Sequence, residues 1–301
     1  MNLNKSQLQA VCHDKGPMMV LAGPGSGKTM VITHRVKWLI EHAGVHPAGI
    51  LVVTFTKAAA QEMSVKFKKK FGEPNGITFS TIHALCLKIL MTYGGLSAEN
   101  IIKTSDQWKF LLETARKCQS VCDPAKAAGN FQMLYSAAMN NRMSPSEVNP
   151  KDIKGISRKD FLFMSEEYRR MKERTGYIDF DDMLVKAYEL MTGNLQVLRQ
   201  LRERWDYIQV DEYQDVNYLQ RDLVYLLAGE KKNLCVAGDD DQSIYRFRGA
   251  RPEIMLNFTK DYPKAETVTL DVNYRCSGRV LSFVLVRITA VIRLLSDVQE
   301  S

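Results

Sequence analysis

One glycine-rich segment has the residue types and spacing of a polyphosphate site: Ala22, Gly23, Pro24, Gly25, Ser26, Gly27, Lys28 and Thr29. An apolar run over 18–21 precedes it, and apolar residues recur at helical spacing over 30–40. Between a strand and a helix N-terminus, the glycines let backbone N–H groups point into one concavity. Lys28 would reach the outer phosphates, and the Thr29 hydroxyl would ligate magnesium. A chance Lys-Thr pair after a glycine turn is the alternative, and Ala22 stands where the strict pattern has glycine.

Acidic residues follow another apolar run, over 207–210, which predicts a buried strand. Asp211 and Glu212 come directly after it. An acid at this place beside a phosphate loop can hold magnesium, and its neighbour can orient the attacking water. We therefore predict that Asp211 is a metal ligand and Glu212 the general base. A further predicted strand over 234–238 leads to Gln242, whose amide could sense the terminal phosphate.

Aromatic and basic residues alternate in Tyr245, Arg246, Phe247 and Arg248. Rings stack on bases and guanidinium groups pair with phosphates, so this pattern favours a surface for single-stranded nucleic acid. A loop whose aromatic residues are buried for packing is the alternative.

Four further residues lie near the predicted ligand edge. Arg275 could stabilise charge on a transferred phosphoryl group, and Tyr274 could stack on adenine. The amide of Gln7, on a predicted helix capped by Asn4, could pair with adenine, although a solvated helix position is favoured from the residues alone. His83 lies at a junction between strand and helix, where a hydrogen-bonded cap is favoured over a nucleic-acid contact.

The elements that position these residues alternate between strands and helices. Apolar runs predict strands near 18–21, 50–55, 77–81, 207–210, 234–238 and 268–270, and helical patterns separate them, as in a parallel sheet. Between about 97 and 176 strand signals disappear, and aromatic residues recur in helical segments, which predicts a helical insertion. Its aromatic residues are expected to lie mostly in a core, although exposed ones could stack on bases. A lysine run closes the helix after 50–55 and is interpreted as a solvated helix end rather than a phosphate contact: Lys66, Lys68, Lys69 and Lys70.

Composition is that of a folded globular protein. The 301 residues are 45% hydrophobic and 25% charged, which excludes a chain dominated by disorder. The net charge of +7 favours a polyanionic partner without identifying it. Six scattered cysteines and a polar N-terminus predict free thiols in a reducing cytoplasm, with Cys118 and Cys122 as two core thiols, and we expect no membrane span.

Taken in order, these segments resemble the superfamily 1 DNA helicases of the UvrD, Rep and PcrA type over residues 1 to about 282. The resemblance rests on Leu3 and Asn4 with Gln7, on 22–29, on 54–59, on 210–215, on 238–250 and on 273–275. Six such segments in one order are far more specific than any one of them.

The resemblance implies an α/β P-loop NTPase with a RecA-like parallel sheet flanked by helices and an all-helical inserted subdomain. It implies a motor domain over 1–97 and 178–282, the insertion over 98–177, and ATP hydrolysis coupled to 3′ to 5′ movement on single-stranded DNA or its junctions with duplex. Gln7 and Tyr274 would hold adenine, and the phosphates and Mg²⁺ would be surrounded by Lys28, Thr29, Asp211, Glu212, Gln242 and Arg275. The DNA path would be lined by Phe55, His83, Tyr245, Phe247 and Arg248.

The sequence departs from this family pattern in three places. Phe247 stands where relatives commonly carry tryptophan, and Met30 where they often carry arginine. Family members also continue into a second RecA-like domain, whereas residues 283–301 carry none of its motifs and are interpreted as either an amphipathic helix or an unnatural ending. Two hypotheses follow. The chain is the amino-terminal half, or a truncated copy, of a DNA-unwinding ATPase, or it acts as it stands, as a nucleotide-responsive single-stranded DNA-binding module without motor activity. In the second case a partner chain could supply the second domain.

Overall fold

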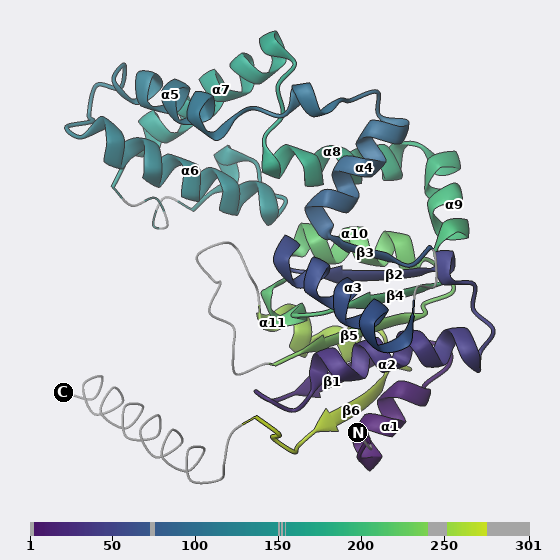
Figure 1. The fold of residues 1–301 in the computed structure, drawn as a ribbon. Coiled ribbons are helices and arrows are strands. Elements are labelled where there is room, and N and C mark those ends of the chain that lie inside the picture. The colour runs from purple at the N-terminus through teal and green to yellow at the C-terminus, as the bar shows by residue number, and fades with distance from the viewer. Residues whose placement is uncertain are drawn as a thin grey trace, which may run out of the picture.

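The computed structural model describes residues 3–72, 76–149, 151, 153, 155–239 and 252–275. Its centre is a six-stranded sheet in the order β3-β2-β4-β5-β1-β6, and every neighbouring pair is parallel (Figure 1). The strands are β1 (Met18–Ala22), β2 (Ile50–Thr54), β3 (Thr78–Thr81), β4 (Tyr207–Val210), β5 (Leu234–Gly238) and β6 (Glu266–Leu270). The predicted parallel α/β sheet is therefore confirmed, with each strand close to its predicted position.

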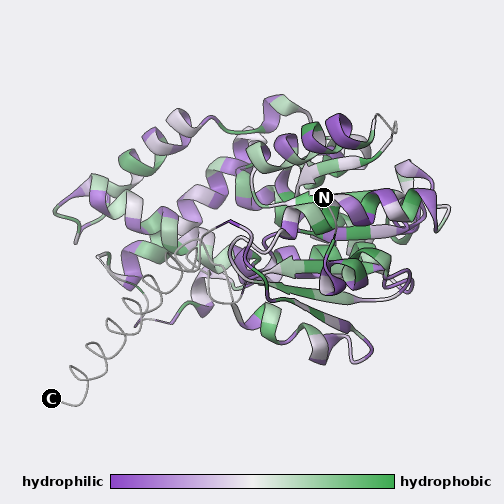
Figure 2. Cartoon of the chain, turned by 60° about the horizontal axis from the view of Figure 1, so that its bottom comes forward, coloured by the Kyte–Doolittle hydropathy of each residue, from purple (hydrophilic) through white to green (hydrophobic). Residues whose placement is uncertain are grey.

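Helices cover both faces of this sheet. One face packs against α1 (Lys5–Cys12), α2 (Lys28–Glu41) and α3 (Lys57–Phe71). The other packs against α4 (Ile82–Tyr93), α8 (Phe180–Gly193), α9 (Leu195–Arg204), α10 (Tyr218–Ala228), α11 (Pro252–Leu256) and α12 (Phe258–Asp261). Strand residues alternate between the two cores: Met18 and Val20 face one, and Met19 faces the other. Figure 2 shows the resulting hydrophobic strands enclosed by helices of mixed hydropathy.

A separate helical layer stands beside the sheet and contains α5 (Thr104–Ala115), α6 (Pro124–Asn140) and α7 (Arg158–Thr175) (Figure 1). Its core includes Phe131, Phe161 and Tyr168, all nearly inaccessible to solvent. The chain leaves and returns at one place, because Ile102 N donates to Ile178 O at 2.9 Å. This contact supports an insertion between these positions, and its exact limits at 98 and 177 stay a prediction.

A buried cation links the helical layer to the first turn of α8. Lys172 Nζ lies 3.1 Å from Asp179 and 2.8 Å from Asp182, and Tyr168 OH donates to Asp179 at 2.9 Å. Burial alone would lower the pKa of Lys172, but the two carboxylates outweigh it and raise the pKa. Asp179 is also the N-cap of α8, as three acids at a helix start indicate.

The described cysteines carry free thiols, and one prediction about them is wrong. Cys118 is buried, but Cys122 is exposed, because it lies in the turn before α6 rather than on a packed helix face. None of the helices in the described ranges is both long and apolar enough to cross a membrane.

Candidate functional site

The glycine-rich segment connects β1 to α2 and forms a concave loop. Gly25 and Gly27 have φ of +73° and +87°, and Gly27 is the N-cap of α2. These left-handed conformations cost little only for glycine. Ser26 Oγ is buried and has no hydrogen-bond partner among the described residues. A loop that bends at two glycines onto a helix N-terminus has the geometry of an anion site, and binding of a polyphosphate by this loop stays a prediction.

Gln7 holds this loop from behind. Its Nε2 donates to Ser26 O at 3.0 Å, and its Oε1 accepts from Asn4 N at 3.1 Å. Asn4 Oδ1 in turn accepts from Gln7 N, which completes a capping box on α1. Gln7 is only 1% exposed, so the solvated position favoured from the residues alone is wrong. Packing of α1 against the loop buries it, and a contact with adenine stays a prediction.

The segment 273–275 lies on the same loop. Asn273 Nδ2 donates to Pro24 O at 2.6 Å, and Tyr274 N donates to Gly25 O at 2.9 Å. Tyr274 OH accepts from Asn4 Nδ2 at 2.9 Å, so this ring stands on the side of the loop where Gln7 lies. Arg275 lines a cavity that opens above this loop. The tertiary structure therefore brings the predicted adenine and phosphoryl residues onto the phosphate loop.

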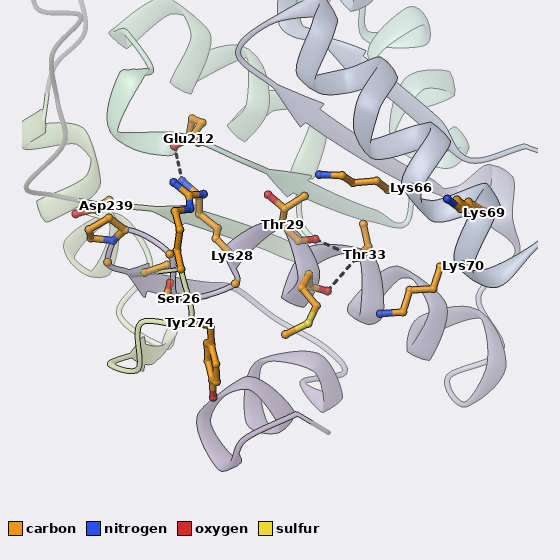
Figure 3. A pocket seen from close by; sticks show the side chains of 17 residues that line it. Ser26, Lys28, Thr29, Thr33, Lys66, Lys69, Lys70, Glu212, Asp239 and Tyr274 are labelled. Carbon is orange, nitrogen blue, oxygen red and sulfur yellow. Dashed lines mark hydrogen bonds and ion pairs between the residues drawn. The ribbon is translucent and has the colours of Figure 1, made fainter. Parts of the chain in front are cut away.

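Lys28 lies between the loop and the predicted acids. Its Nζ is 3.6 Å from Asp211 Oδ1 and makes a direct ion pair with Glu212 (Figure 3). Burial raises the pKa of Asp211 to about 6, and the Lys28 ammonium opposes this rise. Burial also favours neutral Glu212, but Lys28 and Gln214 outweigh it and hold the pKa of Glu212 below its usual value.

Two residues that sequence reasoning missed position Glu212. Gln214 Nε2 donates to Glu212 Oε2 at 2.7 Å, and Gln214 Oε1 accepts from Asp239 N at 3.1 Å. Glu212 itself has φ +54°, an uncommon conformation for a residue with a side chain. The only signal in the sequence was Gln214 inside an acidic segment, and a glutamine does not by its type indicate which residue it contacts.

A cavity of about 770 Å³ opens above the loop and is lined by Lys28, Thr29, Glu212, Tyr274 and Arg275. Its opposite wall carries Lys66, Lys69 and Lys70 from α3 (Figure 3). These lysines are exposed, as predicted for a helix end, but the packing of α3 beside α2 turns them toward the predicted nucleotide cavity. The site is thus more cationic than the loop alone indicated.

The residues fit a magnesium nucleotide. Within the described ranges, no group of three or more His, Cys, Asp or Glu side chains is arranged to hold a metal ion. Magnesium commonly uses one or two carboxylates together with phosphate oxygens and water. Thr29 and Asp211 could supply the protein ligands, and a bound triphosphate could supply the remainder.

A second cavity, of about 840 Å³, lies between the sheet edge and α6. Phe55 and His83 line it, and Glu212 lines both cavities. His83 is not the helix cap, because Thr81 caps α4. The rings of His83 and Phe180 pack edge-on, with their centroids 6.2 Å apart. Burial lowers the pKa of His83. Phe180 is 58% exposed, and the sequence analysis did not single it out because one aromatic residue at a helix start gives no sign of its neighbours.

The remaining predicted residues, Gln242, Tyr245, Phe247 and Arg248, lie outside the described residues. Their roles stay predictions.

Comparison with known proteins identifies the family of this arrangement. A model of the UvrD/REP helicase N-terminal domain matches residues 3–263. The chain belongs to this family. This confirms the resemblance found in the sequence and assigns the parallel sheet to the RecA-like P-loop class.

Two similar relatives are the YjcD protein of Bacillus subtilis and the ATP-dependent DNA helicase PcrA of Staphylococcus epidermidis. The first is 38% identical over 288 residues, which cover 93% of this chain and 37% of the relative. The second is 35% identical over 286 residues, which cover 93% of this chain and 39% of the relative. The chain therefore spans less than two fifths of the length of these curated relatives.

Proposed function

We propose that this chain is the ATP-binding part of a DNA helicase that couples ATP hydrolysis to 3′ to 5′ movement along single-stranded DNA. One observation carries the proposal: Lys28 extends from a phosphate loop to the neighbouring acids Asp211 and Glu212, and Lys28 and Glu212 line one cavity above that loop. This arrangement supplies a cation for phosphates, a ligand for magnesium and a base for water. The similar protein PcrA is named an ATP-dependent DNA helicase, which supports the proposal.

In this proposal the loop amides and Lys28 bind the triphosphate, and Arg275 faces its phosphates. Thr29 and Asp211 hold magnesium, which when bound would neutralise phosphate charge. Glu212 accepts a proton from the attacking water, and the hydrogen bond from Gln214 Nε2 orients its carboxylate for that task. Gln7 and Tyr274 flank the adenine side, where a ring can stack on the base.

Single-stranded DNA would pass along the second cavity, where Phe55 and His83 lie. Aromatic rings stack on bases of any type, so this lining suits a motor that binds DNA without sequence preference. Tyr245, Phe247 and Arg248 would extend the path, and the net charge of +7 favours the phosphate backbone.

We further propose a motor domain over 1–97 and 178–282 with a helical subdomain over 98–177, acting in the cytoplasm. A second RecA-like domain would close over the loop and complete the cleft, whether it belongs to a longer form of this protein or to a partner chain. Such closure gates hydrolysis, so the 301 residues alone should bind nucleotide and turn it over slowly.

The alternative is an ATP-responsive single-stranded DNA-binding module without unwinding activity. It is favoured by the fact that both cavities meet at Glu212 within this one chain.

ATP hydrolysis by the chain tests these proposals, with and without single-stranded DNA and with an added polypeptide that carries a second RecA-like domain. We expect DNA-stimulated turnover when the second domain is present, and Lys28→Ala should abolish it. Nucleotide-dependent DNA binding without turnover under every condition would favour the binding module. Failure of the wild-type chain to bind magnesium-ATP would refute both.

A further inference from the structure

A chain of hydrogen bonds connects the helical layer to the loop that carries the acids. Asn140, the last residue of α6, is 5% exposed. Its Nδ2 donates to Asp181 Oδ1 at 2.7 Å, and its Oδ1 accepts from Asn217 Nδ2 at 3.1 Å. Asp181 lies in the first turn of α8, and Asn217 is the N-cap of α10. One buried amide therefore contacts three helices at once.

The neighbours of Asn140 determine which way its amide points. Asp181 Oδ1 accepts a second hydrogen bond from Ser136 Oγ at 2.9 Å, and Asn217 Oδ1 accepts from Gln220 N at 2.9 Å. Asn140 must thus present its donor to the carboxylate and its acceptor to Asn217. Flipping the amide would break both contacts inside the protein, where unpaired polar groups are costly.

One end of this chain of hydrogen bonds belongs to the acid loop, and both ends line the second cavity. Asn217 follows Asp215 by two residues, so it anchors the short segment 211–217 that contains Asp211 and Glu212. Asn217 lines the second cavity, as do Asn140 and Asp181 from the other end and Asp211 and Glu212 from the acid loop itself. A ligand in that cavity would lie against the same side chains that hold the acid loop.

We propose that Asn140 is a positioning residue through which single-stranded DNA in the second cavity changes the affinity of the nucleotide cavity. The inference rests on the proposed function and adds a route to it, from the helical layer through Asn217 to the loop with Asp211 and Glu212. Because binding linkage is reciprocal, nucleotide changes the affinity for DNA by the same factor.

A second contact between the same layers offers a matched control. Arg142, just after α6, pairs with Asp222 of α10 at 2.7 Å, and its side chain is 48% exposed. This pair joins the same two helices but lies away from the acid loop, and solvent screens it. It should contribute to packing without carrying the linkage.

The test uses the 301-residue chain, a fluorescent oligo-dT and a magnesium complex of a non-hydrolysable ATP analogue. Anisotropy gives the Kd for DNA with and without the analogue, and calorimetry gives the Kd for the analogue with and without DNA. For each ligand, the Kd measured without the other ligand is compared with the Kd measured in its presence. We expect these two ratios to agree and to reach fivefold or more, within the range usual for coupled sites. Asn140→Leu should bring the ratio to within twofold of one, and Arg142→Ala should leave it at the wild-type value.

Asn217→Ser removes the same hydrogen bond by replacing its donor instead of its acceptor. Serine still caps a helix but is too short to reach Asn140, so α10 keeps its N-cap. The linkage should be lost here too, and the double variant should lose no more than either single variant. If Asn140→Leu fails to fold in a thermal melt, Asn217→Ser decides the matter.

Linkage retained in Asn217→Ser, or a wild-type chain that binds both ligands with a ratio near one, would overturn this inference and leave the proposed function standing. A wild-type chain that binds neither ligand would overturn the proposed function, and the inference with it.

Discussion

Replacing Gly25 by alanine should disable the phosphate loop through two separate costs. Gly25 has φ +73°, a left-handed conformation that costs an alanine roughly 1–2 kcal/mol. An added Cβ would also lie 2.7 Å from Arg275 Cβ and 2.8 Å from Asn273 Oδ1, which is too close for either to stay in place. The segment 273–275 would have to leave the loop.

That displacement breaks the hydrogen bonds from Asn273 to Pro24 O and from Tyr274 N to Gly25 O. At about 0.5–1.5 kcal/mol each, their loss adds about 1–3 kcal/mol. The sum is about 2–5 kcal/mol. If this cost falls on the binding-competent loop, magnesium-ATP affinity should drop about 30-fold or more, since each 1.4 kcal/mol is a factor of ten.

Gly16→Ala is a control that carries the backbone cost of a left-handed conformation without the steric cost. Gly16 has φ +90°, but an added Cβ there would meet no atom within 4 Å. Both variants should lose stability to urea, whereas only Gly25→Ala should lose nucleotide affinity, measured by calorimetry. An affinity for Gly25→Ala within threefold of the wild type would refute the argument that this glycine seats the 273–275 segment.

Three further predictions concern stability, measured by urea denaturation. Lys172→Met leaves the buried Asp179 and the partly buried Asp182 without their cationic partner and should cost about 3–5 kcal/mol, whereas Arg170→Met on the exposed face of the same helix should cost about 0.5 kcal/mol or less; equal effects would contradict this. Neither amide atom of buried Gln209 has a hydrogen-bond partner among the described residues, so Gln209→Leu should stabilise by roughly 1 kcal/mol or more, and a loss of stability would be evidence against it. Burial, together with the nearby Glu212 carboxylate, raises the pKa of Asp215 to about 6, so the folded state holds this proton more tightly and wild-type stability falls as pH rises from about 4 through 6. Asp215→Asn should remove the part of this fall that Asp215 contributes and leave the part from Asp211, whose pKa burial also raises to about 6. Parallel pH profiles for the two proteins would show the reasoning to be wrong.

Local patterns in the sequence were sufficient for the elements and for the phosphate loop. Strand, glycine turn and helix depend on backbone conformation and on apolar periodicity within a few residues. The secondary structure of 18–40 could therefore be predicted without knowing which residues pack against it. The cap of α1 by Asn4 was equally local, because donor and acceptor are three residues apart. Six ordered segments then identified the family.

Only the tertiary structure decided which of these residues meet. The strand order places β4 between β2 and β5, with β1 beyond β5, and this order allows Lys28 to reach acids 183 and 184 residues further along the chain. The burial of Gln7, the lysines of α3 on the cavity wall and the contact between Asn140 and Asn217 depend likewise on how helices pack. An amide or ammonium group can pair with many partners, and its type does not specify which one packing brings within 3 Å. The sequence by itself determined the chemistry available to this protein, and long-range packing determined where that chemistry converges.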